Sequence, residues 1–438
     1  MADASNLSCR SGKRNACLTS LPKIDQSRLL RKTLDDDKSA CQWFLQSPRF
    51  EHWRDSSTAE IIYLWARAGC GKTTIARYAI SHLQSANTSV SPKASGFASQ
   101  RCGAESPLVL YFFFSKTAQT EKNDTIIALG TLIHQFLSRD PELHDILQTQ
   151  YDKNETKGNI VWTLELLWDV FAEMINRSTT SHHIYTIIDA LDECNDEDAE
   201  DFVRELVLLV EQWQPSDPHN GVPHIIVTGR RQEHMMDSIA PSQDWEITRE
   251  ETRPDIKSLI KRSVGRLAHR RSLDKEIQTV ISNFLERNAE GMFIWVVLVS
   301  KELALRNQPL TDESIAQKLR AVPGTLVSMY ETILNDTPES RQKDLWRILR
   351  WLLYSKGSLS ILQLQELLCS EVDIPNWYDF ENDIEYVCRS LICIEADSVR
   401  LIHQTARDFL HHYIYDTSIK GTLGIELVSN LLSHYRHF

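Results

Sequence analysis

The sequence has no long hydrophobic run. Its longest strongly apolar stretch, FIWVVLV from Phe293, is much shorter than the roughly 20 residues that a membrane-spanning helix needs. The first residues, MADASNLSCRSGKRNACLTSL, contain no apolar core of the length found in signal peptides. We therefore expect a cytoplasmic protein that makes no use of a membrane.

Basic residues are outnumbered by acidic ones. The chain has 48 Lys and Arg against 60 Asp and Glu, which gives a formal net charge of −12. An acidic chain is poorly suited to the phosphate backbone of nucleic acid, so we expect no nucleic-acid partner. The one dense basic run, KRSVGRLAHRR from Lys261, is typical of a solvated helix face.

Paired cysteines and internal repeats are missing as well. The nine cysteines follow no paired spacing, and the closest two are Cys388 and Cys393. In a chain without an export signal, this pattern indicates reduced thiols and argues against a zinc site. No self-similarity recurs with a period of 30 to 45 residues, which excludes a repeat array.

Short apolar segments alternate with amphipathic helical patterns over the first 250 of the 438 residues. The expected strands are nearly continuous in apolar character, as parallel strands buried on both faces are. They cover residues 61–65, 108–114, 184–188 and 224–228. The expected helices between them cover residues 73–84, 125–137, 164–175 and 199–213. This alternation predicts a three-layer α/β fold with a parallel sheet.

Helical patterns dominate after residue 250. The expected helices cover residues 254–267, 276–288, 292–305, 313–321, 326–334 and 342–354, and residues 399–403 form a short strand candidate. At the other end, residues 1–25 are polar, and we expect them to be disordered. The segment 85–107 is rich in Ser, Ala and Gly and is typical of a mobile surface insertion.

The stretch IIYLWARAGCGKTTIARYAI, from Ile61 to Ile80, has the pattern of a phosphate-binding loop. Backbone N–H groups of such a loop surround a phosphate at the N-terminus of the next helix. Lys72 would bridge the β- and γ-phosphates, and the Thr73 hydroxyl would hold Mg²⁺. The first position of the pattern is Ala66, where glycine is usual. The alternative is a glycine-containing turn with an exposed lysine. The residues expected to contact the nucleotide are Ala66, Gly69, Cys70, Gly71, Lys72, Thr73 and Thr74.

An acidic motif, IYTIIDALDEC, follows at the end of another expected strand. Asp189 at the strand end would order Mg²⁺ through water. Asp192 and Glu193 would orient or deprotonate the attacking water. The alternative is an acidic turn that caps the next helix.

A third motif, HIIVTGRR, ends a further expected strand. An arginine at this position can contact the γ-phosphate and report its presence, and we assign that role to Arg230. The alternative is a pair of surface arginines, Arg230 and Arg231.

Together these motifs resemble the NACHT nucleotide-binding core of fungal NLR-like proteins, which belong to the STAND class of signalling P-loop ATPases and carry a nephrocystin-type N-terminal domain. IYTIIDALDEC is a close match, and IIVTGRR is a looser one. CQWFLQSPRFEHW is similar to the stretch that precedes the family's phosphate loop. NAEGMFIWVVLVSKEL and VPGTLVSMYETIL resemble its helical domain, and LIHQTARDFL resembles the last motif of its winged-helix domain.

The resemblance implies a domain order. Residues 1–25 are a disordered N-terminus, 26–250 the P-loop domain, 251–335 a helical domain and 336–438 a winged-helix domain. His403 matches the winged-helix histidine that contacts the β-phosphate of ADP, with a histidine packed at a helix start as the alternative. Residues 291–293 match the segment placed against the adenine, although Phe293 replaces a proline.

The resemblance also implies a function. ADP would hold the domains closed, ATP with Mg²⁺ would open the chain for self-association, and slow hydrolysis would reset this switch in immunity- or incompatibility-type signalling. The protein partners are not implied. Ala66, Cys70, Gly229 and Arg231 depart from the family pattern, and the usual C-terminal repeats are missing. These departures favour the alternative of a truncated paralogue or non-catalytic scaffold with little nucleotide binding.

Overall fold

The computed structural model describes residues 15–31, 40–85, 107–115, 124–156, 160–179, 182–194, 196–214, 220–232, 236–304, 312–355, 358–369, 379–395 and 397–419. The chain divides into two compact units. The first consists of Met1–Arg67, Gly71–Ser115 and Thr120–Thr252, and the second of Ala68–Cys70, Lys116–Gln119 and Arg253–Phe438. Each unit is described by itself.

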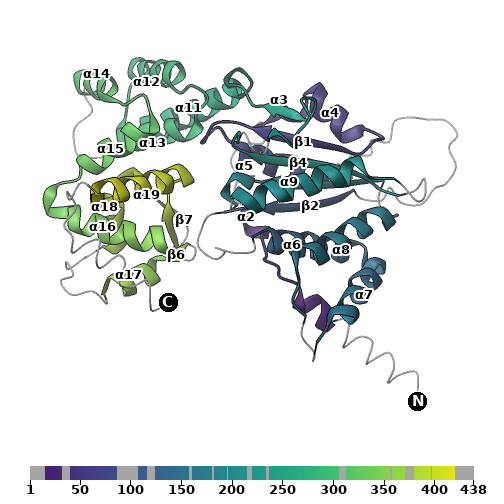
Figure 1. Ribbon diagram of the computed structural model, residues 1–438. Coiled ribbons are helices and arrows are strands. Elements are labelled where there is room, and N and C mark those ends of the chain that lie inside the picture. The colour runs from purple at the N-terminus through teal and green to yellow at the C-terminus, as the bar shows by residue number, and fades with distance from the viewer. Residues whose placement is uncertain are drawn as a thin grey trace. The chain divides into compact units, whose positions relative to one another are not determined.

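A five-stranded parallel sheet forms the centre of the first unit (Figure 1). Its strand order is β2-β3-β4-β1-β5. The strands are β1 (Glu60–Trp65), β2 (Leu108–Phe113), β3 (His183–Asp189), β4 (Val222–Gly229) and β5 (Asp244–Glu246). The four strands expected from the apolar pattern are confirmed. The fifth, β5, has only three residues, which is too short for a periodic signal.

Helices cover both faces of this sheet, because parallel strands require crossover connections that lie on the faces. Successive β1 residues alternate between the faces: Ile61 and Tyr63 belong to one core cluster, and Ile62 and Leu64 point the other way. The helices of the first unit are α2 (Ser27–Arg31), α3 (Gln42–Leu45), α4 (Pro48–Asp55), α5 (Lys72–Ser85), α6 (Asp124–Arg139), α7 (His144–Asn154), α8 (Leu164–Arg177) and α9 (Asp196–Glu211).

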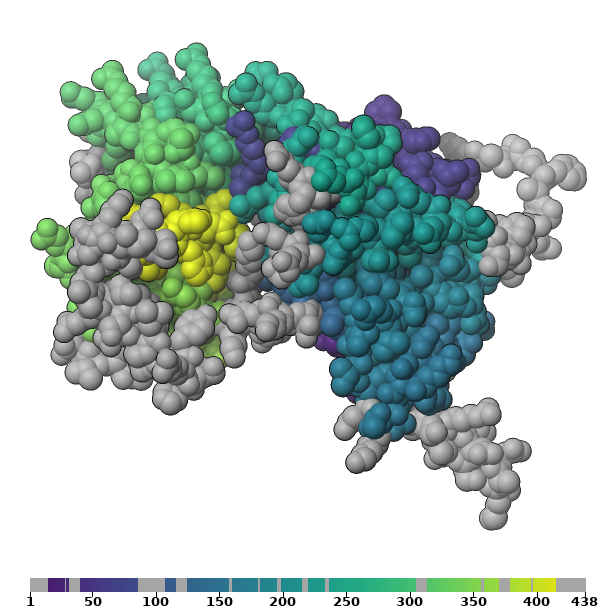
Figure 2. Space-filling model, viewed as in Figure 1, coloured from purple at the N-terminus to yellow at the C-terminus, as the bar shows by residue number. Residues whose placement is uncertain are grey.

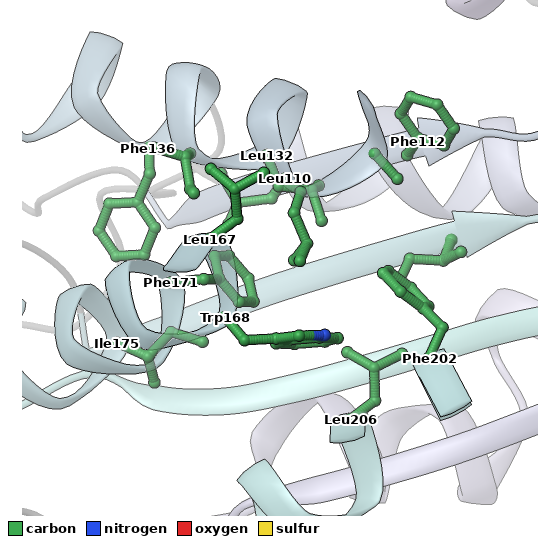
Figure 3. Packing of buried hydrophobic residues seen from close by; sticks show 14 of the residues in the cluster. Leu110, Phe112, Leu132, Phe136, Leu167, Trp168, Phe171, Ile175, Phe202 and Leu206 are labelled. Atoms are coloured by element: carbon green, nitrogen blue, oxygen red, sulfur yellow. The ribbon is translucent and has the colours of Figure 1, made fainter. Parts of the chain in front are cut away.

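The larger core cluster lies between the sheet and helices α6, α8 and α9. Figure 3 shows Trp168 and Phe171 of α8 in one cluster with Leu110 of β2 and Phe202 of α9. The rings of Trp168 and Phe202 have centroids 5.2 Å apart. Each fully buried side chain of this size stabilises the fold by about 1.5–3 kcal/mol. The all-atom view in Figure 2 shows side chains filling the spaces between the ribbons.

The opposite face is covered by α4 and α5. Trp53 of α4 is completely buried. The centroid of its ring lies 5.5 Å from that of Tyr185 and 5.7 Å from that of His224, which are on neighbouring strands. Burial lowers the pKa of His224 to about 3, so this imidazole is neutral at physiological pH.

The N-terminal expectation requires a correction, because residues 15–25 are packed. Residues 15–20 are helical, and Cys17 and Leu21 belong to the core of the first unit. The side-chain amide of Gln26 makes two 2.8 Å hydrogen bonds to the backbone of Phe113 and so continues the edge of β2. Gln135 does the same for Tyr111. Polarity alone suggested that residues 1–25 are disordered, but Cys17 and Leu21 are buried in the core. Gln26 and Gln135 cover the edge strand β2. Residues 1–14 and most of the expected insertion, 86–106, lie outside the described residues.

The second unit is mostly helical and ends in a small sheet. Its helices are α11 (Arg249–Arg271), α12 (Lys275–Asn288), α13 (Phe293–Ala304), α14 (Asp312–Ala321), α15 (Leu326–Asn335), α16 (Glu339–Tyr354), α17 (Ile361–Cys369), α18 (Phe380–Cys388) and α19 (Gln404–Ile419). An antiparallel sheet of β6 (Leu359–Ser360), β8 (Ser398–Leu401) and β7 (Ile392–Glu395), in that order, packs with α16 to α19. Figure 2 shows α19, in yellow, among the side chains of the green helices.

All six helices expected after residue 250 are present in this unit, and the strand candidate 399–403 overlaps β8. The first helix differs most, since α11 begins at Arg249 and continues through Pro254. No helix in the described ranges combines the length and apolar character needed to cross a bilayer. All seven cysteines that the structure describes are free thiols.

Two glycines within helices provide a test of the N-terminal packing. A Cβ at Gly130 of α6 would lie 2.1 Å from the backbone oxygen of Pro22. We predict that Gly130→Ala lowers the free energy of unfolding by about 1–3 kcal/mol, because the N-terminal segment must shift. Chemical denaturation of the purified chain measures this change.

Gly265 of α11 is the matched control, because nothing lies within 4 Å of a Cβ placed there. Gly265→Ala should raise the free energy of unfolding by about 0.5–1 kcal/mol through helix propensity alone. If Gly130→Ala were also stabilising, the packing of residues 15–25 against α6 would be disproved.

Candidate functional site

The predicted site residues of the first unit lie at the carboxyl ends of three adjacent strands. β1 leads into the phosphate loop, and α5 begins at Lys72 directly after it. β3 ends at Asp189, and β4, which lies between β1 and β3, ends at Gly229. Carboxyl ends of parallel strands meet at one edge of the sheet, which is where such folds bind ligands.

The phosphate loop takes a conformation that requires glycine at two positions. Gly69 and Gly71 have φ angles of 78° and 87°, in the left-handed region that side chains disfavour. Ala66 does not have a positive φ, so its methyl group causes no backbone strain in the loop. The Lys72 Nζ donates to the carbonyl oxygens of Ala66 at 2.9 Å and Arg67 at 3.3 Å. The departure at Ala66 is therefore compatible with the loop.

Three loop residues, Ala68–Cys70, cluster with the second unit. There the backbone N–H of Phe293, the first residue of α13, donates to the Gly69 carbonyl at 2.9 Å. A Cβ on Gly69 would lie 2.4 Å from Cγ2 of Ile294. Proline at position 293 could not donate this hydrogen bond. The adenine contact expected for residues 291–293 stays a prediction.

Asp189 is the central acidic group of the site. Its side chain is 1% exposed and accepts hydrogen bonds from the hydroxyls of Thr228, at 2.6 Å, and Thr73. Burial raises the pKa of Asp189, while these hydrogen bonds and the charges of Arg77 and Lys72 oppose the rise. The structure thus brings the predicted metal residues Thr73 and Asp189 together.

Sequence reasoning missed the role of the Thr228 side chain, which also accepts the backbone N–H of Ala190 at 3.1 Å. A hydroxyl-bearing residue at the end of the neighbouring strand is the signal that could have revealed it. Ala190 itself has a φ of 57°, unusual for a residue with a side chain. It turns the chain from β3 into the 3₁₀ helix Leu191–Glu193.

The predicted catalytic residues divide between two environments. Asp192 is 9% exposed, and its carboxylate is 2.9 Å from the Nε of Arg230. Glu193 is partly exposed, and its backbone N–H donates to the Ala190 carbonyl at 2.8 Å. Thr74 is partly exposed in the first turn of α5. Two of the three predicted catalytic groups, Asp192 and Arg230, therefore form an ion pair.

The two arginines after β4 point to different partners. Arg230 pairs with Asp192, whereas the Arg231 guanidinium lies 4.8 Å from the ring centre of Trp65 and 4.0 Å from a carboxylate oxygen of Asp244. Only Arg230 is thus associated with the acidic motif. The reporter role assigned to Arg230 stays a prediction.

Position 229 carries glycine where the pattern usually has serine. The Tyr63 hydroxyl fills the space that a side chain at position 229 would need. Tyr63 is completely buried in β1, and its hydroxyl donates to the Arg230 carbonyl at 2.8 Å. A Cβ on Gly229 would lie 2.6 Å from this hydroxyl oxygen and 3.6 Å from Oδ1 of Asp192. Glycine at 229 and tyrosine at 63 are therefore a matched pair.

His403 belongs to the second unit and directly precedes α19. Its Nδ1 accepts the backbone N–H of Thr405 at 3.1 Å. The expected alternative, a histidine packed at a helix start, is therefore what its local contacts show. Its role toward ADP stays a prediction.

The matched pair predicts a non-additive response to mutation. Gly229→Ala should lower the free energy of unfolding by about 1–3 kcal/mol, because the Tyr63 hydroxyl must move. Tyr63→Phe removes that hydroxyl and one hydrogen bond, at a cost of about 1 kcal/mol. Chemical denaturation of both single variants and the double variant measures the coupling.

In the double variant, Gly229→Ala should cost far less than it does beside Tyr63. Additive effects of the two substitutions would show that the hydroxyl is not what requires glycine at position 229.

Two families match separate parts of the chain. The family described as "Nephrocystin 3, N-terminal" matches residues 39–230, which include the phosphate loop, Asp189 and Arg230. The family described as "GPI inositol-deacylase, winged helix domain" matches residues 334–418, which include His403.

A curated relative covers both regions. The vegetative incompatibility protein HET-E-1 of Podospora anserina is 24% identical over 412 residues, which are 91% of this chain. The chain spans 28% of the length of that relative.

The chain is also similar to two solved structures. A Walker-type ATPase of Pyrococcus abyssi has 14% identity and a TM-score of 0.35, over 83% of this chain and 93% of that one. The ORC2 protein of Aeropyrum pernix in its ADP form has 11% identity and a TM-score of 0.36, over 88% and 92%. Scores this low add nothing to the fold described above. The two family matches and the HET-E-1 relative, together with the phosphate loop and the acidic strand end, support the resemblance of this chain to the fungal NACHT-type, NLR-like proteins.

Proposed function

We propose that the chain is a nucleotide-dependent signalling switch, which binds ATP or ADP with Mg²⁺ at the phosphate loop and hydrolyses ATP slowly. The observation that carries this proposal is the grouping of Thr73, Asp189 and Thr228 beside a loop with two left-handed glycines. A purely structural turn needs neither a buried carboxylate nor a helix that begins at a Gly-Lys-Thr sequence.

The oxygen groups of the site fit a magnesium ion. Mg²⁺ prefers hard oxygen ligands and is held in such sites by one or two protein groups together with phosphate oxygens and water. Thr73 and Asp189 supply a hydroxyl and a carboxylate, and burial disfavours the charge of Asp189. A cation would offset that cost. No group of three or more ligating side chains lies among the described residues, so phosphate would have to complete the site.

Lys72 is suited to exchange one set of oxygen partners for another. Its ammonium group now donates to the carbonyl oxygens of Ala66 and Arg67, which belong to the loop that would surround the phosphate. Phosphate oxygens carry more negative charge than carbonyl oxygens and accept stronger hydrogen bonds from an ammonium group. Nucleotide binding would move Lys72 from the loop carbonyls to the β- and γ-phosphates.

The pairing of Asp192 with Arg230 supports slow hydrolysis. The Arg230 guanidinium, 2.9 Å from the Asp192 carboxylate, occupies the oxygen that would otherwise be available to the attacking water. Arg230 would contact the γ-phosphate only after this ion pair loosens. Asp192, Glu193 and Arg230 would then orient the attacking water and stabilise the developing charge.

Switching requires that ATP and ADP favour different states of the two units. The residues with this capacity are His403, which would contact the β-phosphate of ADP, and Arg230, which would report the γ-phosphate. The resulting change would expose surfaces for self-association, in signalling of the incompatibility or innate-immunity type. The similarity to an incompatibility protein supports this context.

A second candidate function is a scaffold that keeps the fold and binds nucleotide weakly. The observation that favours it is the engagement of Lys72 and Asp192 by groups of the protein itself. Titration with a fluorescent ATP analogue separates the two functions. The switch requires saturable binding at micromolar concentrations, and the scaffold gives none.

Replacing the loop lysine tests the proposal directly. Lys72→Ala should lower the affinity for ATP and ADP about ten- to a hundredfold, because it removes charge-assisted hydrogen bonds to phosphate. Fluorescent-nucleotide titration measures the effect. Lys257→Ala is the control, since Lys257 forms a surface ion pair with Glu286 in the second unit. Equal affinities for Lys72→Ala and the unmodified chain would refute the assignment of the site.

Replacing Asp189 with asparagine should have opposite effects on the unfolding temperature and on nucleotide binding. Because burial raises the pKa of Asp189 above its ordinary value of 3.8, this group favours the folded state at low pH. That contribution is lost as pH rises through the raised pKa. Without nucleotide and Mg²⁺, Asp189→Asn should therefore unfold at a higher temperature than the original chain at neutral pH.

The stability difference should shrink as the pH falls toward 4, while magnesium-dependent nucleotide binding is lost in Asp189→Asn at every pH. Thermal unfolding between pH 4 and pH 8 measures the first effect, and titration with and without Mg²⁺ the second. A variant that is less stable than the original chain at neutral pH would contradict the buried-charge interpretation.

A further inference from the structure

The N-terminal segment, residues 15–26, is anchored to the first unit before it reaches the sheet. Cys17 and Leu21 are buried in the core of that unit. The backbone N–H of Ile24 donates to the side-chain hydroxyl of Thr131, a buried residue of α6, at 3.2 Å. The segment is therefore docked by both apolar and polar contacts.

The last anchor is Gln26, which lies at the carboxyl end of β2. Gln26 is 4% exposed, its Nε2 donates to the Phe113 carbonyl, and its Oε1 accepts the Phe113 N–H, both at 2.8 Å. Because β2 is an edge strand of the sheet, these two backbone groups of its last residue point away from β3. Strand ends at an edge open most easily, so Gln26 holds the strand where it is weakest.

Two connections lead from this strand end to Asp189. The next residue, Phe114, donates its backbone N–H to the Asp189 carbonyl at 2.9 Å. The Arg77 guanidinium lies 5.6 Å from the ring centre of Phe113, and its charge also acts on the Asp189 carboxylate. The end of β2 is thus held by Gln26 on one side and joined to the acidic group of the site on the other.

The position of Asp189 depends on β2 more than on β4. The ladder between β3 and β2 continues to the pair of Asp189 and Phe113, whereas the ladder between β3 and β4 ends one residue earlier, at Ile188. A metal-binding carboxylate must be held in a narrow range of positions to be effective. Opening of the β2 end would therefore disturb the group on which the proposed metal site depends.

We propose that Gln26 is a positioning residue of the nucleotide site, so that docking of the N-terminal segment and binding of magnesium nucleotide at Asp189 are coupled. The coupling rests on the proposed function, whereas the positioning of the β2 end does not. With Asp189 engaged by a ligand, the end of β3 is fixed, and with it the backbone groups that Gln26 binds. By linkage, the ligand strengthens docking by the same factor by which docking strengthens ligand binding.

Amide hydrogen exchange of the full chain without nucleotide tests the positioning. Gln26→Ala should speed exchange of the Phe114 N–H about fivefold, because the strand end opens more often. Gln135→Ala is the matched control, since it removes the same pair of hydrogen bonds from Tyr111, two residues earlier in β2. Mass spectrometry of peptides that cover β2 measures both rates.

The control should leave exchange of the Phe114 N–H nearly as slow as in the unmodified chain. Equal acceleration in Gln26→Ala and Gln135→Ala, or no acceleration in Gln26→Ala, would overturn the positioning role.

Nucleotide titrations test the coupling. Gln26→Ala should lower the affinity for ATP with Mg²⁺ about five- to tenfold. It should leave the affinity measured in EDTA nearly unchanged, because Asp189 acts through the metal. Gln135→Ala should change neither affinity. A loss that is equal with and without Mg²⁺ would show a general disturbance of the fold and contradict the proposal.

Thr131→Val reaches the N-terminal segment by a second route. It keeps the shape of the side chain and removes the acceptor of the Ile24 N–H, without changing Gln26 or β2. It should lower the affinity for ATP with Mg²⁺ by a smaller factor, about two- to threefold. This variant also keeps the proposal testable if Gln26→Ala does not fold.

The reciprocal effect is visible in the unmodified chain. ATP with Mg²⁺ should slow exchange of the Ile24 N–H by about the factor that Gln26→Ala costs in affinity. An Ile24 exchange rate that stays the same while nucleotide is bound would disprove the coupling.

The two levels of the proposal fail in different ways. If the unmodified chain binds no nucleotide, the proposed function and the coupling fail together, and exchange of the Phe114 N–H decides whether Gln26 positions the strand end. If nucleotide binds and Gln26→Ala has the affinity of the unmodified chain, the N-terminal segment only covers the edge of β2, and the coupling is refuted.

Discussion

The buried carboxylate of Asp189 is the group on which the site depends. Its charge is costly at 1% exposure, and it is tolerated because the hydroxyls of Thr73 and Thr228 donate to it while Lys72 and Arg77 lie near. The start of α5, the end of β3 and the end of β4 must therefore converge, which fixes the phosphate loop next to the acidic motif. A site that stores unfavourable charge in this way gains most from a cation, and this links the stability of the fold to the proposed binding of Mg²⁺ and nucleotide.

The residues around this carboxylate show how the chain accommodates departures from its family pattern. Ala66 takes the place of a glycine where φ is not positive, so the loop keeps its conformation. Gly229 is required because the Tyr63 hydroxyl fills the space of a side chain and supports the backbone of Arg230. The position of Arg230, and with it the ion pair to Asp192, thus depends on a residue in the middle of a neighbouring strand. The local backbone and packing therefore accommodate the departures at Ala66 and Gly229.

In the second unit, contacts with α15 and α16 hold the start of α19. The Nδ1 of His403 accepts the backbone N–H of Thr405 at 3.1 Å. The Thr405 hydroxyl lies 2.8 Å from the hydroxyl of Tyr330 in α15, and Arg407 donates to the Leu352 carbonyl in α16. Side chains of three helices therefore fix the first turns of α19.

The sequence by itself determined the elements and the local motifs. Nearly continuous apolar runs identified four of the five parallel strands, and helical periodicity identified the main helices. The Gly-Lys-Thr and Asp-x-x-Asp-Glu patterns indicated the candidate site. These signals are local, because they depend on residues a few positions apart. Only the tertiary structure decided the strand order, the packing of residues 15–25 against α6, the match of Gly229 with Tyr63, and the different partners of Arg230 and Arg231. These features join residues far apart in the chain, as the 167 positions between Tyr63 and Arg230 illustrate. Side-chain shape and direction across such distances leave no periodic trace in the sequence, so folding alone brings those groups together.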